Sequence, residues 1–179
     1  MPKPKLILLN GFAGAGKTTV AKMYIADHPL AMVIEGDELI VNMGSWQANE
    51  DEARRLLFLL TKAMARTYLV EGRDVLLPYL VTSAGDVDEF EKIAKDIGAE
   101  FYEFILHNDR PTAIARLLER GTWGEAGQPP ISDDELPVIE DLAARMEREL
   151  EKRPGAIRIN VKVGDPKITY REFVHCLSE

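Results

Sequence analysis

The sequence has a single cysteine, Cys176, among its 179 residues. One thiol cannot form an internal disulfide and cannot supply a cysteine cluster for a metal. The composition therefore favours a reducing compartment, and we expect a cytoplasmic location. The three histidines, His28, His107 and His175, lack the spacing of metal ligands or of a catalytic triad, so we expect packing or surface roles for them.

Long apolar runs and an excess of positive charge are also missing. No apolar stretch approaches the roughly 18 residues that cross a bilayer, and no small-residue cleavage site precedes the first apolar run, so we expect no membrane partner and no secretory signal. The chain has 30 acidic and 22 basic residues and a formal net charge of −8. Proteins that grip a nucleic-acid backbone usually carry the opposite balance, so this charge argues against nucleic acid as a partner.

A glycine-rich turn lies between an apolar run and an amphipathic pattern near the start of the chain. Residues 6–22 read LILLNGFAGAGKTTVAK, in which Gly11, Gly16, Lys17 and Thr18 fit the pattern G-x-x-x-x-G-K-[ST]. Glycine permits positive φ and a close approach of the backbone, so that successive N–H groups can surround a phosphate. The start of the following helix adds free N–H groups and a positive dipole end. We predict that this loop binds a nucleoside triphosphate.

The pattern also predicts individual roles and cofactors. Lys17 reaches the β- and γ-phosphates, and the Thr18 hydroxyl binds Mg²⁺. ATP and Mg²⁺ are the predicted cofactors. The predicted nucleotide-binding residues are Gly11, Ala13, Gly14, Ala15, Gly16, Lys17, Thr18 and Thr19.

Apolar runs alternate with helical periodicity along the chain, which predicts an α/β fold over residues 1–179 as one domain. The expected strands are 5–10, 30–36, 74–81, 100–106 and 156–163. The expected helices are 17–27, 48–72, 87–98, 110–120, 133–152 and 168–177. Strands separated by helices form parallel sheets covered on both faces, with the ligand cleft at the carboxyl ends of the strands. The Gly/Pro-rich segment 121–132 is expected to be functional or mobile.

A triphosphate loop within the first twenty residues of a short α/β chain resembles the small P-loop kinases related to nucleoside monophosphate kinases. The resemblance implies a three-layer P-loop NTPase sandwich, a five-stranded parallel sheet in the order 2-3-1-4-5, and a helical lid. In that group an acidic residue just after the second strand takes the proton of the acceptor hydroxyl. The match in IEGDELI is Asp37, which becomes the predicted base and a second metal ligand with Thr18. The alternative is that Asp37 caps a short helix.

The sequence TAIARLLERGTWGEAGQPPISDDELPVIEDLAARM resembles the lid of polynucleotide-kinase-like proteins, and it is similar to the lids of antibiotic phosphotransferases and zeta-toxin-like sugar kinases. In such lids an arginine covers the phosphates. The resemblance therefore implies catalytic roles for Arg116 and Arg120, which lie four residues apart on one helix face, and a lid at about 116–134. The alternative is that both arginines are solvated partners of Glu119 and Asp109.

Two departures from the family pattern stand out. Polynucleotide kinases carry an arginine three residues beyond the acceptor aspartate, and this chain has Ile40 there. The strand expected at 74–81 also ends without the carboxylate that often holds Mg²⁺ through water. Metal binding would then rely on Thr18, the phosphates, water and Asp37.

The acceptor pocket is expected between residues 37–46, the front of the long helix and residues 78–85. Its expected lining is apolar, apart from three polar side chains, and comprises Leu39, Met43, Trp46, Tyr79, Leu80, Asn42, Thr82 and Ser83. Such a lining suits a partly apolar molecule with a hydroxyl better than a free phosphate. A core position is an equal alternative for Trp46. Arg54 and Arg55 are expected to pair with the acidic residues at 50–52.

The predicted function is ATP-dependent, Mg²⁺-assisted transfer of the γ-phosphoryl group to a hydroxyl of a small-molecule acceptor. One alternative is a nucleotide-binding switch or NTPase, for which Gln47 and Gln128 are loosely placed water-orienting candidates. Another is a kinase of nucleic-acid 5′-hydroxyl ends, which Ile40 and the acidic charge disfavour.

Overall fold

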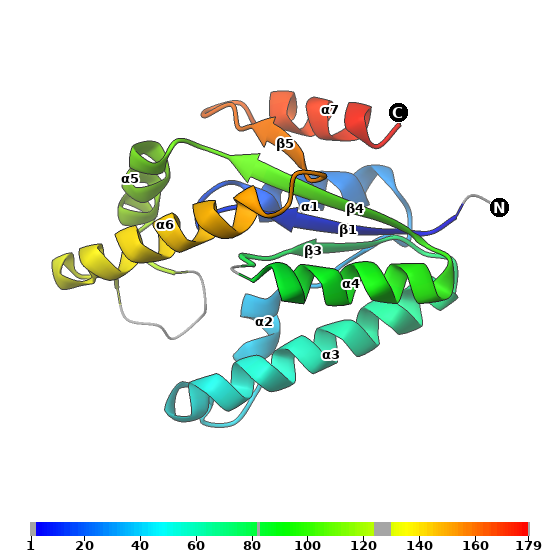
Figure 1. Ribbon diagram of the computed structural model, residues 1–179, viewed down its shortest axis with the longest axis horizontal. Helices are drawn as coiled ribbons and strands as arrows, with labels where there is room; N and C mark the ends of the chain where they lie inside the picture. Colours follow the sequence, from blue (N-terminus) through cyan, green and yellow to red (C-terminus); the bar gives the residue numbers. More distant parts are fainter. Residues whose placement is uncertain (1–2, 82, 124–129, 179) are drawn as a thin grey trace.

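Parallel strands form one sheet in the order β2-β3-β1-β4-β5 (Figure 1). The computed structural model describes residues 3–81, 83–123 and 130–178. The strands are β1 (Lys5–Asn10), β2 (Met32–Val33), β3 (Val75–Pro78), β4 (Glu100–His107) and β5 (Ile157–Asn160). The α-helices are α1 (Lys17–Asp27), α2 (Gly36–Ile40), α3 (Glu50–Val70), α4 (Ala84–Ile97), α5 (Arg110–Arg120), α6 (Leu136–Glu151) and α7 (Pro166–Cys176). Two short 3₁₀ helices are η1 (Trp46–Asn49) and η2 (Asp133–Glu135).

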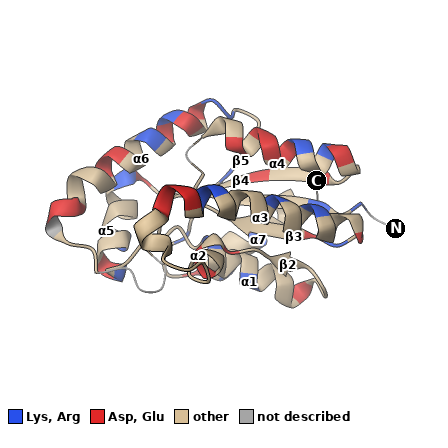
Figure 2. Ribbon diagram, turned by 90° about the horizontal axis from the view of Figure 1, so that it is seen from below, with Lys and Arg blue, Asp and Glu red and all other residues tan. Residues whose placement is uncertain are grey.

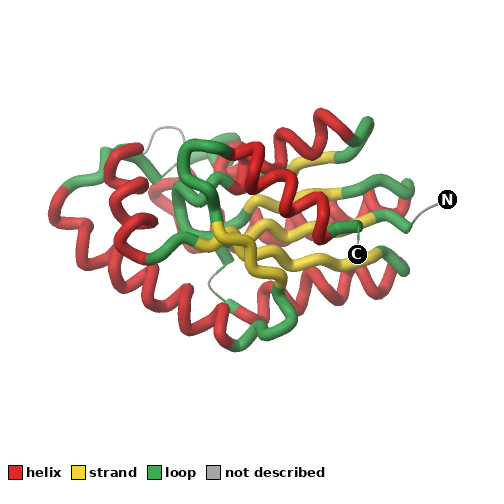
Figure 3. Tube along the Cα trace, turned by 90° about the horizontal axis from the view of Figure 1, so that it is seen from above, coloured by secondary structure: helices red, strands yellow, loops and turns green. Residues whose placement is uncertain are grey.

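Alternation along β1 divides the core into two layers. Leu6 and Leu8 pack with residues of α3 and α4, whereas Ile7 and Leu9 pack with residues of α1 and α7. Successive side chains of a strand point to opposite faces, so one apolar strand serves both layers. The tube in Figure 3 shows helices on both sides of the strands. The predicted three-layer α/β fold and its strand order are thus confirmed.

The second strand is much shorter than the expected 30–36. Only Met32 and Val33 pair with β3, because Leu30 has a φ of +68° and the chain turns into α2 at Gly36. A Cβ on Gly36 would lie 3.1 Å from the Tyr79 hydroxyl, so glycine allows α2 to pack closely on the sheet. This early turn brings residues 35–37 to the carboxyl end of the sheet.

The predicted helices are present with small shifts, whereas β3 and β5 are shorter than expected and α2 and η1 were not predicted. Helix α5 coincides with the expected 110–120, since the Asp109 carboxylate accepts the Thr112 amide at its start and Gly121 closes it in the left-handed region. The helix expected at 133–152 divides into η2 and α6. Within the described ranges, no helix is both long and apolar enough to cross a membrane.

Candidate active site

The phosphate-binding loop joins β1 to α1 and depends on glycine for its shape. Gly14 and Gly16 have φ values of +77° and +90°, and α1 begins directly after Gly16. Gly11 has a φ of +152°, and a Cβ there would lie 2.7 Å from the Leu106 carbonyl oxygen. A side chain at position 11 would therefore collide with the end of β4. Of the other predicted loop residues, Ala13 and Ala15 are buried, while Thr19 is exposed.

Asn10 anchors the start of this loop, a role that sequence reasoning missed. Its side chain is buried, and its Oδ1 accepts the amides of Gly11 (2.9 Å) and Val81 (3.0 Å). Its Nδ2 donates to the Val81 carbonyl at 3.2 Å. These bonds tie the loop to the segment after β3. The only signal in the sequence was a polar residue at the end of an apolar run.

Lys17 folds back over the loop. Its Nζ donates to the carbonyls of Gly11 (2.7 Å) and Phe12 (3.0 Å). Burial lowers the pKa of Lys17 to about 8; the negative charge of Asp37 opposes this shift and the positive charge of Arg120 adds to it. Lys17, Asp37 and Arg120 are therefore close enough to interact electrostatically.

Thr18 contacts a carboxylate that the sequence prediction did not include. Its Oγ1 donates to Glu35 Oε2 at 3.0 Å, and Glu35 Oε1 lies 3.7 Å from Lys22 Nζ. Glu35 comes directly after the shortened β2 and precedes α2. It places a carboxylate beside Thr18, whereas the end of β3 has none. The sequence signal was an acidic residue two positions before Asp37, at the end of the second strand.

A hydroxyl and a carboxylate at this separation fit Mg²⁺, which prefers oxygen ligands. No group of three or more His, Cys, Asp and Glu side chains in the described residues could hold a metal ion. Mg²⁺ in nucleotide sites needs no such cage, since one or two carboxylates, phosphates and water complete its coordination. The residues present therefore fit the metal as a partner of a bound nucleotide.

Asp37 is not a helix cap. Helix α2 begins at Gly36 with Glu35 in the capping position, so Asp37 lies inside its first turn. Its charge acts on Lys17 and also on Tyr79, whose pKa rises to about 12 chiefly through burial. Asp37 thus does not occupy the N-cap position, and its charge acts on both Lys17 and Tyr79.

The two lid arginines lie in different surroundings. Arg116 is half-buried against the phosphate loop, and its Cβ lies 3.6 Å from the position that a Cβ on Gly14 would take. One Arg116 guanidinium nitrogen, Nη1, is buried and has no hydrogen-bond partner among the described residues. Arg120 is exposed and donates to the carbonyls of Thr122 (2.7 Å) and Trp123. Only Arg116 thus combines contact with the loop and an unused donor.

The base of the segment between α5 and α6 is closed by backbone and side-chain bonds. The Ile131 amide donates to the Gly121 carbonyl at 3.0 Å, and Glu135 accepts from the Trp123 indole and from the Ser132 amide, both at 3.0 Å. Residues 124–129 of the predicted lid, Gln128 among them, lie outside the described residues, and so does Thr82 of the predicted acceptor pocket.

Several of the side chains expected to line the acceptor pocket pack in the core. Trp46 is 4% exposed and packs with Ile40, Ala53 and Leu57, which settles it as a core residue. Tyr79 packs against the α3–α4 layer, and its hydroxyl lies 2.6 Å from Thr61 Oγ1. Leu39 packs against both the Trp46 cluster and the Tyr79 cluster, Met43 packs beside Trp46, Leu80 packs with α5 and α6, and Asn42 and Ser83 are exposed. Leu39 thus links the surroundings of Trp46 and Tyr79, and the common lining stays a prediction.

The surface arginines of α3 behave as expected. Arg54 Nη2 lies 2.8 Å from Glu50, and Arg55 Nη2 lies 2.7 Å from Glu52. Both pairs are exposed helix pairs of the kind that contributes little to stability.

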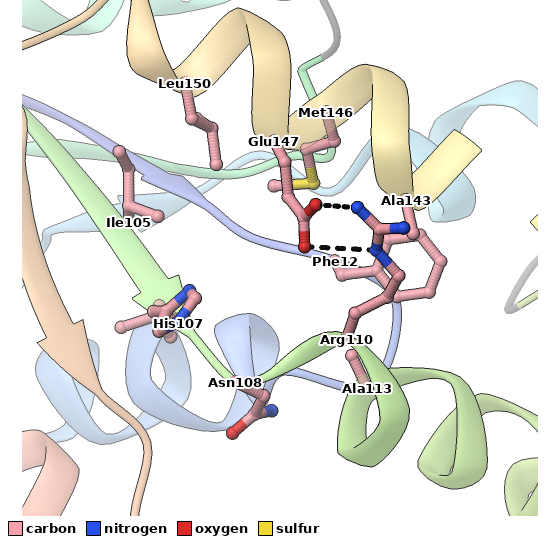
Figure 4. Close-up of a pocket in the computed structure, with 11 residues that line it drawn as sticks. Phe12, Ile105, His107, Asn108, Arg110, Ala113, Ala143, Met146, Glu147 and Leu150 are labelled. Atoms are coloured by element: carbon pink, nitrogen blue, oxygen red, sulfur yellow. Dashed lines mark hydrogen bonds and ion pairs between the residues drawn. The ribbon is translucent and has the colours of Figure 1, made fainter. Parts of the chain in front are cut away.

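A cavity beside the phosphate loop is too small for a substrate. Phe12, Ala113 and Met146 contribute to its walls, and an ion pair between Arg110 and Glu147 lies at its rim (Figure 4). Its volume is about 30 Å³, roughly the space of one water molecule.

The fold and the loop together define a nucleotide-binding P-loop protein with the kinase-type arrangement of strands. The chain belongs to the AAA domain family, whose model matches residues 6–150. No curated protein sequence matches the chain.

Two solved structures share the fold at low sequence identity. A gluconokinase from Sinorhizobium meliloti 1021 matches with a TM-score of 0.63 and 17% identity, covering 99% of this chain and 94% of that one. A chain of the Pnkp1/Rnl/Hen1 RNA repair complex matches with a TM-score of 0.65 and 15% identity over 85% of this chain. This chain spans only 47% of that longer one. The predicted resemblance to P-loop kinases is confirmed at the level of the fold.

The likeness to a protein of an RNA repair complex corrects one prediction. The prediction that the acidic net charge argues against nucleic acid as a partner is wrong. Net charge averages the whole surface, whereas contact with a nucleic-acid end depends on the local charge around one site. Figure 2 shows basic and acidic residues interspersed along α4 and α6. The net charge of the chain therefore does not describe the charge of any one part of its surface.

Proposed function

We propose that the protein transfers the γ-phosphoryl group of ATP to a hydroxyl group of an acceptor. The observation that carries the proposal is that Asp37, in the first turn of α2, is near enough for its charge to act on Lys17. A switch or simple NTPase requires the loop and a positioned water. A carboxylate next to the γ-phosphate position supplies the proton acceptor that an attacking hydroxyl needs.

The loop amides and Lys17 would hold the β- and γ-phosphates. Asp37 would accept the proton of the acceptor hydroxyl while the hydroxyl oxygen bonds to the γ-phosphorus. The bond between the γ-phosphorus and the β–γ bridging oxygen breaks at the same time, and ADP is released. Thr18 and Glu35 would hold Mg²⁺, which neutralises phosphate charge when bound.

Arg116 is the better candidate for charge stabilisation on the transferred group. Its buried Nη1 has no partner among the described residues, whereas the Arg120 guanidinium is already bonded to two backbone carbonyls. A donor that is positioned but unused contributes most when negative charge develops beside it. We propose residues 116–134 as the lid in which Arg120 secures the base and Arg116 meets the phosphates.

A small hydroxyl compound is the first candidate acceptor, supported by the likeness to a gluconokinase over nearly its whole length. A nucleic-acid 5′-hydroxyl end is the second, supported by the likeness to a chain of the RNA repair complex. Both acceptors would give their hydroxyl proton to Asp37. They differ in the part of the acceptor molecule that carries the hydroxyl.

The test is a transfer screen with Asp37→Asn as the matched variant. ATP consumption is measured with sugar acids, other polyols, nucleosides and 5′-hydroxyl oligonucleotides, each against a background without acceptor. We expect at least one class to raise consumption, and Asp37→Asn to lower that rate roughly 10²-fold while ATP affinity stays within a few-fold. Consumption that no acceptor raises, with equal rates for both proteins, would instead identify an NTPase or switch.

A further inference from the structure

Helix α1 presents two side chains to the same carboxylate. Thr18 and Lys22 lie one turn apart, and both reach Glu35: the Thr18 hydroxyl at 3.0 Å on Oε2 and the Lys22 ammonium at 3.7 Å on Oε1. The Glu35 side chain is only 15% exposed, whereas that of Lys22 is 60% exposed. A nearly buried carboxylate is thus held between the proposed metal-binding hydroxyl and a solvated cation.

This carboxylate poses an electrostatic problem for an empty phosphate site. A nucleoside triphosphate brings several negative charges to the loop beside Glu35, and like charges at short range repel strongly where water is partly excluded. A divalent cation would remove the repulsion. Before it arrives, Lys22 is the cation that pairs with Glu35 among the described residues.

The geometry of Lys22 suits a temporary role. Its ammonium group makes an ion pair with Glu35 at 3.7 Å but no hydrogen bond of ordinary length, and most of its side chain is in water. A long, solvated lysine can move aside at little cost when a stronger cation takes over the carboxylate. Thr18, by contrast, has a short side chain in the first turn of α1, so its hydroxyl cannot move far from Glu35.

We infer that Lys22 is a resident counter-cation of the metal site. It neutralises Glu35 while Mg²⁺ is absent, so that the triphosphate can bind before the metal, and it yields the carboxylate when the metal binds. Lys22 is therefore a positioning residue that sets how strongly nucleotide binding depends on Mg²⁺. This inference rests on the proposed metal site at Thr18 and Glu35.

The experiment measures the Kd of a non-hydrolysable ATP analogue in EDTA and in saturating Mg²⁺, for the wild type and for Lys22→Met. In EDTA we expect the Kd of the variant to rise roughly three- to tenfold, the size expected for one partly screened unit charge near the phosphates. In Mg²⁺ the two proteins should agree within about twofold, because the metal replaces the lost charge. Lys22→Arg should restore the wild-type value in EDTA.

Two controls separate this role from general charge attraction. Lys92→Met removes an exposed lysine that pairs with Asp96 on α4, and it should leave both Kd values unchanged. Glu35→Gln removes the repelling charge itself, so its Kd in EDTA should fall below that of the wild type. Equal weakening by Lys22→Met with and without Mg²⁺, no weakening at all, or an unchanged Kd in EDTA for Glu35→Gln would each overturn the inference.

The outcomes also separate this inference from the proposed function. A wild type that binds the analogue with the expected Mg²⁺ dependence, yet transfers phosphate to no acceptor, would refute the kinase proposal and leave the role of Lys22 intact. A wild type that transfers phosphate but shows no selective effect of Lys22→Met in EDTA would do the reverse.

Discussion

Replacing Lys17 by methionine should make the empty protein's stability less dependent on pH, while nucleotide binding is lost. Burial lowers the pKa of Lys17 from the usual 10.5 to about 8. At about 1.36 kcal/mol per tenfold change in proton affinity, keeping this lysine protonated at pH 7 costs the fold about 3 kcal/mol. Between pH 8 and 10.5 the unfolded chain binds a proton that the folded protein has released, so wild-type stability rises with pH in this window.

The assay is urea denaturation of the wild type and Lys17→Met between pH 7 and 9.5. The unfolding free energy of the wild type should rise by about 2 kcal/mol relative to that of Lys17→Met between pH 7 and 9.5. By pH 9.5 the folded wild type has released the proton, so about 2 of the 3 kcal/mol of burial cost is no longer paid. Triphosphate affinity of the wild type should fall above pH 8, since only protonated Lys17 attracts phosphate. A stability difference that stays constant with pH would refute the assignment of this burial cost to Lys17.

Two further predictions concern the loop and the lid. Gly11→Ala should destabilise the protein by roughly 2–4 kcal/mol in urea denaturation, because the new Cβ would lie 2.7 Å from the Leu106 carbonyl oxygen. Gly44→Ala is its control and should change stability by less than about 0.5 kcal/mol, since no atom lies within 4 Å of the added group; similar losses for both would contradict the steric argument. Arg116→Ala should lower phosphoryl transfer roughly 10²-fold and more than Arg120→Ala, as measured by single-turnover rates; the opposite order would assign the phosphate contact to Arg120.

The sequence alone determined the phosphate loop, the α/β class and the order of the elements. Each of these depends on local patterns: the spacing of Gly11, Gly16 and Lys17, and the alternation of apolar runs with helical periodicity. Local signals of this kind act within a few residues, so α1 and α5 begin and end where the sequence predicted.

Only the tertiary structure decided which side chains meet at the site. Glu35 faces Thr18 because β2 stops early and the chain turns at Gly36, and Asn10 bonds to Val81 because β1 and β3 are neighbours in the sheet. These contacts join residues from 17 to 71 positions apart, and no local pattern specifies them. The different surroundings of Arg116 and Arg120 likewise come from the packing of α5, since their sequence spacing treats them alike.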